Sequence, residues 1–415
     1  MTALTTTEPS VSHRRAIEAL RAGVPCLDAV AMLGSGQTEI EDRFLDLLGT
    51  TREGRASGML IGGGFGSGKS HLLEHLMRLA LDEGFAVSRV VISKETPLHD
   101  RAKVFSAAAD CAVVAGGSGP AIAGAAAALD VDGRGFAELL RWSLSPAAGL
   151  NERFAATLSL YGKIRDLDPE FAEKLVRFWS GDPISVPDLR RRLKAAGEGP
   201  VALSPVSAKD LAEQRLRFAA RLFTAAGGAG WLFLFDEVEL VGRYSLLQRA
   251  KSYAEIARWV QGDHQVPGLP VAAVLAMTDD FEAAVITGKK DRENVPARLR
   301  DRQTPDALAL SNRAQAGMRI IDREMTLLTP PDAAELDRAY GRLKELHGTA
   351  FGWNPPDIAG LERLGATRMR QYIRAWINEW DLVRLDPAFQ PDTVAVQMDS
   401  DYREDVDLEG IPEEA

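Results

Sequence analysis

The chain has 415 residues but only two cysteines, Cys26 and Cys111. Two cysteines cannot build a disulfide framework, and neither stands in a spacing typical of a metal site, so the composition indicates a reduced, intracellular protein. The first ten residues are polar and rich in threonine, a composition that a secretory signal does not have. We therefore expect a cytoplasmic location.

Long hydrophobic runs are also scarce. Residues 111–129 carry no charge, but they are mostly alanine and glycine and include Pro120. Because this segment has few large apolar side chains, its signal for membrane insertion is weak. We expect a pair of helices rich in small residues, or a flexible loop, and no association with a membrane.

Charge of one sign is abundant only at one end. The net charge is −10, yet residues 399–415 hold eight acidic residues and one arginine, so the rest carries about −3. An acidic tail of this kind is typically disordered and solvated. A second interpretation is that it competes with nucleic acid for a basic surface. The acidic total therefore does not exclude nucleic acid as a ligand.

The most informative motif is a complete G-x-x-x-x-G-K-[ST] phosphate loop over residues 63–70. The apolar residues 59–62 before it predict a buried strand. Residues 71–81 after it carry apolar side chains at helical spacing. A loop between a strand and a helix is the context in which this motif binds nucleotide phosphates.

The chemistry of the loop explains its residue types. Glycines let backbone N–H groups close around phosphate oxygens, and the helix start adds a positive dipole. Lys69 is expected to reach the outer phosphates, and the Ser70 hydroxyl to ligate Mg²⁺. The predicted ATP-binding residues are Gly63, Gly64, Phe65, Gly66, Ser67, Gly68, Lys69, Ser70 and His71.

A second motif ends in two carboxylates. Residues 231–235 are apolar throughout, as in a strand covered on both faces, and Asp236 and Glu237 follow. Asp236 is predicted to hold Mg²⁺, usually through water, and Glu237 to polarise the attacking water. Because this pair supplies a base as well as a metal ligand, it favours ATP hydrolysis over storage of nucleotide.

The remaining pattern alternates strands and helices and has no internal repeat. Strands are expected at 86–93, 271–277 and around 319–328. Apolar spacing and Gly/Pro punctuation predict helices at 14–22, 40–48, 101–114, 135–144, 151–160, 169–179, 187–196, 208–225 and 246–260, and helices within 332–384. This alternation implies an α/β fold with a parallel sheet and right-handed crossovers.

The spacing of the motifs suggests a division of the chain. About 135 residues separate the second strand from the Asp-Glu strand, too many for a simple crossover. We expect a helical N-terminal segment, a P-loop core with a helical insertion, a helical lid and an acidic tail. These parts correspond to residues 1–50, 51–330, about 100–225 within the core, 331–390 and 391–415.

Three blocks together carry a resemblance to a known family: residues 62–71, 91–98 and 235–239. They resemble the ATP-binding proteins, the BrxD family, of bacteriophage-exclusion (BREX) systems. That family is similar to AAA+ ATPases of the replication-initiator type, and the resemblance covers roughly residues 14–385.

The resemblance implies an oligomeric AAA+ ATPase in anti-phage defence, acting on DNA beside other defence-operon proteins such as a large helicase. It also implies roles for individual residues. Thr278 resembles the sensor-1 position, and Arg298 or Arg300 is placed where an arginine finger would reach a neighbouring subunit. Arg370 resembles sensor 2 in the lid, with Arg368 as the runner-up.

One departure from the initiator pattern concerns DNA binding. We expect no winged-helix domain after the predicted lid, so contact with DNA is expected from the insertion or from a partner protein. Within the insertion, residues 189–194 are basic; they read either as a solvated helix face or as a phosphate-contacting patch. Residues 71–75 match the zinc pattern H-x-x-E-H, but that helix must face phosphate, so no zinc is expected.

Three functions remain open at this stage. The first is an ATP-hydrolysing AAA+ enzyme that engages DNA and drives a defence partner. The second is a nucleotide-gated interaction module whose ATP state controls partner assembly, with slow turnover and no direct DNA binding. An independent DNA translocase is the weakest, because no second P-loop half and no helicase motif set is found.

Overall fold

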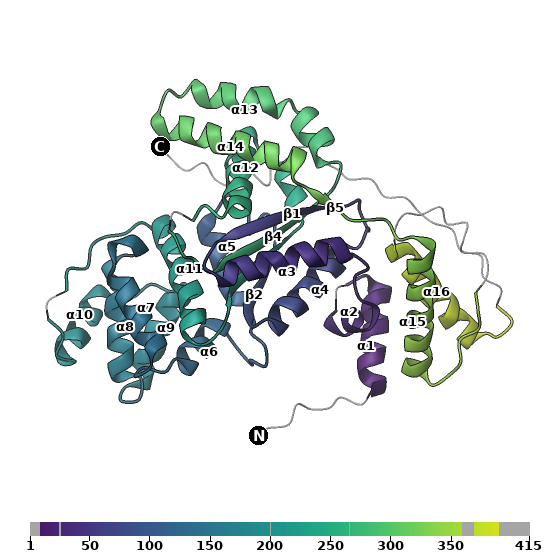
Figure 1. Cartoon of the computed structure of the whole chain (residues 1–415), viewed down its shortest axis with the longest axis horizontal. Helices are drawn as coiled ribbons and strands as arrows, with labels where there is room; N and C mark the ends of the chain where they lie inside the picture. The colour runs from purple at the N-terminus through teal and green to yellow at the C-terminus, as the bar shows by residue number, and fades with distance from the viewer. Residues whose placement is uncertain (1–8, 25, 200, 265, 359–368, 390–415) are drawn as a thin grey trace.

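A parallel five-stranded sheet forms the centre of the molecule (Figure 1). The structure is a computed structural model and describes residues 9–24, 26–199, 201–264, 266–358 and 369–389. The strands are β1 (Ser57–Gly62), β2 (Phe85–Val91), β3 (Gly230–Asp236), β4 (Val271–Met277) and β5 (Thr326–Leu327). Their order across the sheet is β2-β3-β4-β1-β5, and all pairs are parallel.

The apolar runs of the sequence explain why these strands are central. Every residue of β3 and of β4 is buried, as expected for parallel strands covered on both faces. β4 lies between β1, which precedes the phosphate loop, and β3, which carries the Asp-Glu pair. The predicted α/β class with a parallel sheet is therefore confirmed, as are the four main strands.

Helices cover both faces of the sheet. On one face, α3 (Thr38–Arg52) and α4 (Lys69–Asp82) pack on Ile61, Leu234 and Val274. On the other, α5 (Arg101–Cys111), α11 (Ala208–Ala225) and α12 (Leu246–Gln261) pack on side chains that include Phe233 and Leu275. The alternation of side chains along each strand thus separates two apolar clusters.

A group of helices joins β2 to β3, and those between its first and last members lie to one side of the sheet in Figure 1. It comprises α5, α6 (Ala121–Ala128), α7 (Arg134–Leu144), η1 (Pro146–Ala148), α8 (Glu152–Ile164), α9 (Pro169–Ser180), α10 (Val186–Ala195) and α11. The helices predicted here are confirmed. α6 lies within residues 111–129, for which we expected a pair of helices rich in small residues or a flexible loop. Among the described residues, no helix is long and apolar enough to cross a membrane.

The segment after β4 corrects one prediction. η3 (Glu282–Thr287) and α13 (Asp291–Arg300) lead to α14 (Pro305–Arg323), so residues 319–323 are helical and the strand expected around 319–328 shrinks to β5. The reason is close packing of α14 on α12. A Cβ at Gly317 would lie 1.9 Å from the Tyr253 carbonyl oxygen, so glycine allows the approach. Ile320 and Ile321 are buried by the same helix pair.

A smaller helical cluster lies at the other end of the sheet (Figure 1). α1 (Pro9–Ala22), α2 (Leu27–Leu33), α15 (Ala333–Phe351) and α16 (Met369–Leu385) share an apolar core. This core includes Ile17, Leu343 and Trp380, each fully buried. Segments from the two ends of the described chain therefore pack together. The predicted acidic tail and Arg368 lie outside the described residues.

Candidate nucleotide-binding site

The phosphate loop connects the end of β1 to the start of α4. Gly66 and Gly68 have φ of +80° and +104°, values that side chains strongly disfavour. Gly68 precedes Lys69, the first residue of α4, so the loop runs straight into a helix N-terminus. Backbone N–H groups and the helix dipole therefore converge on one point, which is the arrangement that binds phosphate.

The side chains of the loop are arranged around this point. Lys69 is buried, and its Nζ donates to the carbonyl oxygens of Gly63 at 2.7 Å and Gly64 at 3.2 Å. The hydroxyl of Ser67 is buried and has no hydrogen-bond partner among the described residues. A lysine charge and an unpartnered hydroxyl so close to a helix N-terminus suit an anionic ligand.

The two predicted carboxylates lie at the end of β3. Asp236 is 4% exposed, and its Oδ1 accepts a hydrogen bond of 3.0 Å from the Glu237 backbone N–H. Glu237 has a φ of +58°, a left-handed conformation uncommon for a residue with a side chain. Partial burial and the neighbouring Asp236 raise the pKa of Glu237 above its ordinary value, as befits a residue that must accept a proton.

Sequence reasoning missed a third acid, Glu239. It lies on the 3₁₀ helix η2 (Val238–Arg243), lines the same cavity, and its Oε2 has no hydrogen-bond partner in the described part of the chain. Burial raises the pKa of Glu239 to about 7, while the charge of Lys69 opposes the shift. Its position three residues after Asp236 was the available signal.

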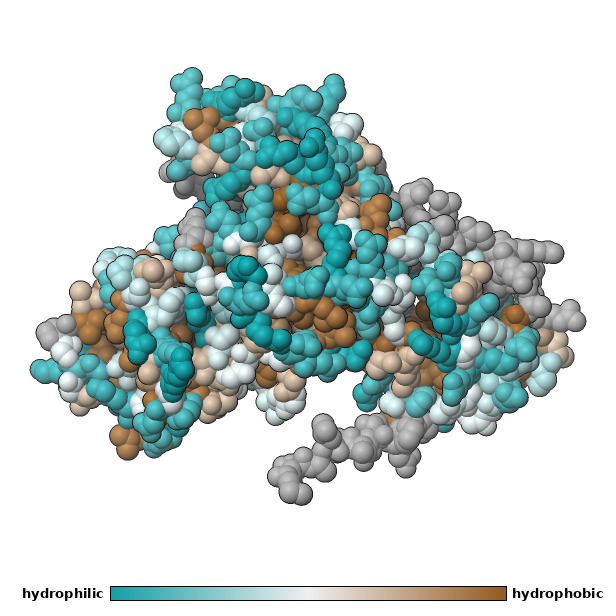
Figure 2. Space-filling model, viewed as in Figure 1, coloured by the Kyte–Doolittle hydropathy of each residue, from teal (hydrophilic) through white to brown (hydrophobic). Residues whose placement is uncertain are grey.

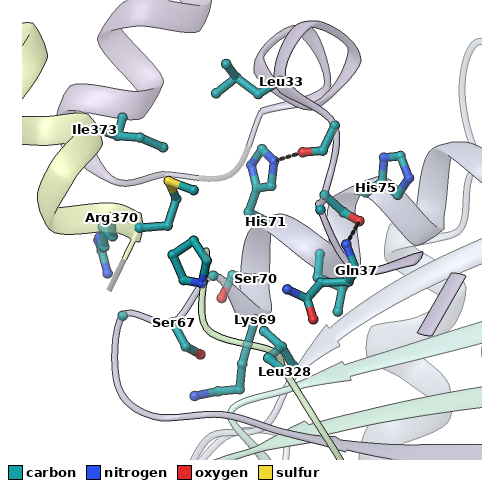
Figure 3. A pocket seen from close by; sticks show the side chains of 18 of the residues that line it. Leu33, Gln37, Ser67, Lys69, Ser70, His71, His75, Leu328, Arg370 and Ile373 are labelled. Atoms are coloured by element: carbon teal, nitrogen blue, oxygen red, sulfur yellow. Dashed lines mark hydrogen bonds between the residues drawn. The ribbon is translucent and has the colours of Figure 1, made fainter. Parts of the chain in front are cut away.

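The phosphate loop opens into a cavity of about 550 Å³ (Figure 3), a size typical of small-molecule sites. Three parts of the chain form most of its walls. The first is the phosphate loop with Asp236, Glu237 and Glu239. The second is the segment from α1 to α3, and the third is the α15–α16 pair. A nucleotide in this cavity would therefore touch segments far apart in the sequence.

Arginines of α15 and α16 line the cavity opposite the phosphate loop. Arg370 is exposed, and its Nη2 donates to the Gly23 carbonyl at 2.9 Å. Figure 3 shows it with Lys69 and Ser70 around the same space. Arg338 and Arg342 also line the cavity, although no motif had singled them out. Only the fold brings them there, because α15 is otherwise an ordinary amphipathic helix.

The turn between α2 and α3 is held in place from three directions. His71 Nε2 donates to the Gly34 carbonyl at 2.7 Å, and Arg342 Nη1 donates to the Leu33 carbonyl at 2.8 Å. Gln37 exchanges two hydrogen bonds with the backbone of Thr329, at 3.0 and 2.9 Å. Burial lowers the pKa of His71.

The H-x-x-E-H residues have separate partners. His71 contacts Gly34, His75 lies 3.1 Å from Glu41, and Glu74 pairs with Arg89 at 3.0 Å. Within the described ranges, no group of three or more His, Cys, Asp or Glu side chains is arranged to hold a metal ion.

The remaining predicted residues lie outside this cavity. Thr278 is buried directly after β4, the strand between β1 and β3. Arg298 and Arg300 are exposed on α13, and neither lines the cavity. Figure 1 places α13 far from the α1, α15 and α16 cluster, and Figure 2 shows hydrophilic residues gathered over α13 and α14. The structure thus does not bring these arginines to the phosphate loop of the same molecule.

The residues of the cavity fit a magnesium nucleotide. Ser70 and Asp236 line the cavity and carry hydroxyl and carboxylate oxygens, the hard ligands that Mg²⁺ prefers. Lys69 and the N-terminus of α4 offer donors and positive charge for phosphates. The glycines at positions 66 and 68 leave the backbone accessible.

A comparison with protein families supports ATP as the ligand of this cavity. Residues 10–110 match the family described as BREX system ATP-binding protein BrxC/D. The match spans α1 to α5 and includes the whole phosphate loop. The resemblance to BREX ATP-binding proteins is thereby confirmed over this segment. No curated protein and no solved structure gives a significant match.

Proposed function

We propose that this protein binds and hydrolyses Mg-ATP as an AAA+ ATPase of BREX anti-phage defence. One observation carries the proposal: Lys69, Ser70, Asp236 and Glu237 line a single cavity although β4 separates the strands that bear them. The family match supports ATP as the nucleotide. The raised pKa of Glu237 supports hydrolysis, because a carboxylate with a higher pKa accepts a proton more readily.

Each residue has a distinct part in the proposed reaction. Lys69 and the loop N–H groups bind the outer phosphates, and Ser70 and Asp236 would hold Mg²⁺. When bound, the metal neutralises charge that develops on the transferred phosphoryl group. Glu237 orients the attacking water and draws off its proton. The walls contributed by α2 and α15 shield the phosphates from bulk water.

The AAA+ assignment rests on the order of the elements. A strand inserted between the P-loop strand and the Asp-Glu strand suits the additional-strand class of ATPases. We assign residues 51–330 to the core, residues 331–390 to the lid and Arg370 to sensor 2. Thr278, at the end of β4, takes the sensor-1 role. Because Arg298 or Arg300 cannot serve its own cavity, the finger acts in a neighbouring subunit, which requires an oligomer.

DNA or a helicase-type defence protein is the proposed partner. On α10, Arg191 pairs with Asp188 at 2.6 Å and Arg192 pairs with Asp168. Arg190 and Lys194 are exposed on the same helix and carry the charge that phosphates would meet. Because two of the arginines are paired with aspartates, the basic surface of α10 is modest. We therefore propose contact through a protein partner on equal terms with direct contact to DNA.

A second candidate is a nucleotide-gated interaction module. It is favoured by the three-part wall of the cavity, because one bound ATP would bridge the phosphate loop, the α2–α3 turn and α15–α16. A ligand that contacts all three shifts the protein toward their closed arrangement by its difference in affinity. In this case hydrolysis would be slow and would reset the partner-bound state.

The deciding experiment uses Glu237→Gln. This variant should bind ATP normally and lose hydrolysis, by 100-fold or about that order. Size-exclusion chromatography with light scattering, with ATP and with or without a DNA duplex, then reports the assembly. Glu173→Gln, at an exposed position of α9, is the control and should hydrolyse at the unmutated rate. Hydrolysis by Glu237→Gln at the unmutated rate would refute the catalytic assignment.

The same measurement separates the two functions. An ATP-dependent oligomer that retains DNA supports the AAA+ DNA machine. An ATP-bound monomer that ignores DNA supports the gated module.

A further inference from the structure

Arg89, Glu74 and Asp236 form a linked set of charged side chains, mostly shielded from solvent, behind the phosphate loop. Arg89 on β2 donates from Nη2 to Asp236 Oδ2 at 2.7 Å and from Nη1 to Glu74 Oε2 at 3.0 Å. The side chains of Arg89, Glu74 and Asp236 are 21%, 11% and 5% exposed. Pairs this deeply placed are weakly screened by solvent, unlike ordinary surface salt bridges.

The fold makes this contact a direct result of sheet register. On adjacent parallel strands, Arg89 is opposite Leu234 and Val91 is opposite Asp236. Arg89 and Asp236 therefore lie on the same sheet face, diagonal to each other. That face is covered by α4, which carries Glu74.

The contact spans the two elements that carry the proposed magnesium ligands. Ser70 and Glu74 are four residues apart on α4 and so lie on the same side of the helix. Asp236 ends β3. Because Arg89 donates one hydrogen bond to Glu74 and another to Asp236, it fixes the spacing between α4 and the end of β3.

The carboxylate of Asp236 is held from both sides. Oδ1 accepts the Glu237 N–H and Oδ2 accepts Arg89, so the plane of the carboxylate cannot rotate freely. A carboxylate has about four lone-pair positions, so acceptor capacity remains for a ligand. Removing Arg89 would free this rotation and leave two acids without their shared cation.

We infer that Arg89 is a positioning residue of the magnesium site, acting through Asp236 with Glu74 as its anchor. The inference rests on the proposed function. Side chains that orient metal ligands typically change metal affinity 10- to 100-fold when they are removed. Arg89 should therefore affect the dependence on Mg²⁺ and leave metal-free binding of nucleotide to Lys69 and the loop unaltered.

The test titrates Mg²⁺ into protein with a fluorescent ATP analogue, starting from EDTA. For Arg89→Met, the half-saturating Mg²⁺ concentration should rise about 10-fold, while binding in EDTA stays within about 2-fold. Glu74→Gln keeps Arg89 but loosens its anchor and should give a smaller rise. Arg89→Lys keeps the charge without the two-armed contact and should fall between Arg89→Met and the unmutated protein. The matched control is Arg78→Met, which lies on α4 with Glu74 but pairs with Asp82.

Loss of a buried pair can also unfold a protein, so melting curves accompany the titration. If Arg89→Met does not fold, Arg89→Lys and Glu74→Gln carry the test. Unchanged Mg²⁺ dependence in the folded variants overturns the inference and leaves Arg89 a purely structural residue. If the unmutated protein binds the analogue without any effect of Mg²⁺, the proposed magnesium site itself fails, and the inference falls with it.

Discussion

His71 and Gly34 join the helix after the phosphate loop to the N-terminal helical segment. The imidazole Nε2 donates to the carbonyl at 2.7 Å, and His71 directly follows Ser70. Gly34 is the residue at which α2 ends, with a φ of +72°. A movement of the α2–α3 turn would therefore displace His71, which is adjacent to the proposed magnesium ligand Ser70.

His71→Phe should loosen this connection. The Gly34 carbonyl would lose its donor, at a cost of about 1–3 kcal/mol in the free energy of unfolding. ATP affinity should fall as well, because the turn lines the cavity. Thermal unfolding and a nucleotide titration measure the two effects, with His13→Phe on α1 as the control. Unchanged ATP affinity would show that the turn does not contribute to the site.

Lys69→Ala should abolish most nucleotide binding. A charge-assisted contact to phosphate contributes about 1.5–3 kcal/mol, which corresponds to a roughly 10- to 100-fold loss of affinity. The fold should persist, since in the described part of the chain the hydrogen bonds of the Lys69 side chain go to carbonyls of its own loop. Isothermal titration with ATP checks the affinity and circular dichroism checks the fold. Binding at the unmutated affinity would place the phosphates elsewhere.

Arg298 and Arg300 should act across a subunit boundary. Alanine at the true finger position should remove hydrolysis, as should Glu237→Gln, because each homogeneous assembly lacks one component. Mixing the two inactive proteins creates sites with an intact Glu237 beside an intact arginine, so part of the activity should return. The ATPase rate of the mixture, compared with each protein alone, is the measurement. No recovery for either arginine would argue against a finger on α13.

Gly317→Ala tests the packing of α14 on α12. The added methyl group would meet the Tyr253 carbonyl at 1.9 Å, so the helices must separate. Overpacking of this kind costs about 1–3 kcal/mol. Gly341→Ala on α15, with nothing within 4 Å, is the control and should gain about 0.5–1 kcal/mol from helix propensity. Chemical denaturation measures both, and equal effects would contradict the close packing.

His99 should make the fold sensitive to acid. Burial lowers the pKa of His99 to about 4, assisted by the positive charge of Lys251. Because the unfolded chain binds a proton near pH 6.5 and the folded chain does not, stability is retained above pH 6.5 and lost as the pH falls toward 4. The loss between pH 7 and pH 5 is about 2 kcal/mol.

His99→Phe keeps an aromatic ring beside Tyr244, 5.5 Å between centroids in the native pair, and removes the titration. Its unfolding free energy should therefore change less between pH 7 and pH 5 than that of the unmutated protein. His13→Phe again serves as the control. An identical pH dependence in His99→Phe would assign the acid sensitivity to other groups.

Local patterns predicted the strands and the phosphate loop well, because both depend on residues adjacent in sequence. The apolar runs ending at Gly62 and Asp236 place buried strands correctly. The strand expected around residues 319–328 is confirmed only for the two residues of β5, because Ile320 and Ile321 are buried by a neighbouring helix, which local alternation cannot reveal.

Apart from Arg370, the wall opposite the phosphate loop could not be predicted, for the same reason. Arg338 and Arg342 line the cavity only because α15 packs against α1 and α2. Arg89 likewise contacts Asp236 through the register of β2 and β3, which no motif encodes. The roles of Thr278, Arg298, Arg300 and Arg370 stay predictions.

The long connection between β2 and β3 affects how readily these two strands pair. The connection runs from Val91 to Gly230, which belong to adjacent strands. A flexible connection of that length would add an entropic penalty to the pairing of β2 with β3. Here α5 and α11, its first and last helices, pack against each other and against the sheet. Because α5 and α11 pack together, the two ends of this connection lie close to each other. The helices between them can therefore change in size or shape without moving Asp236.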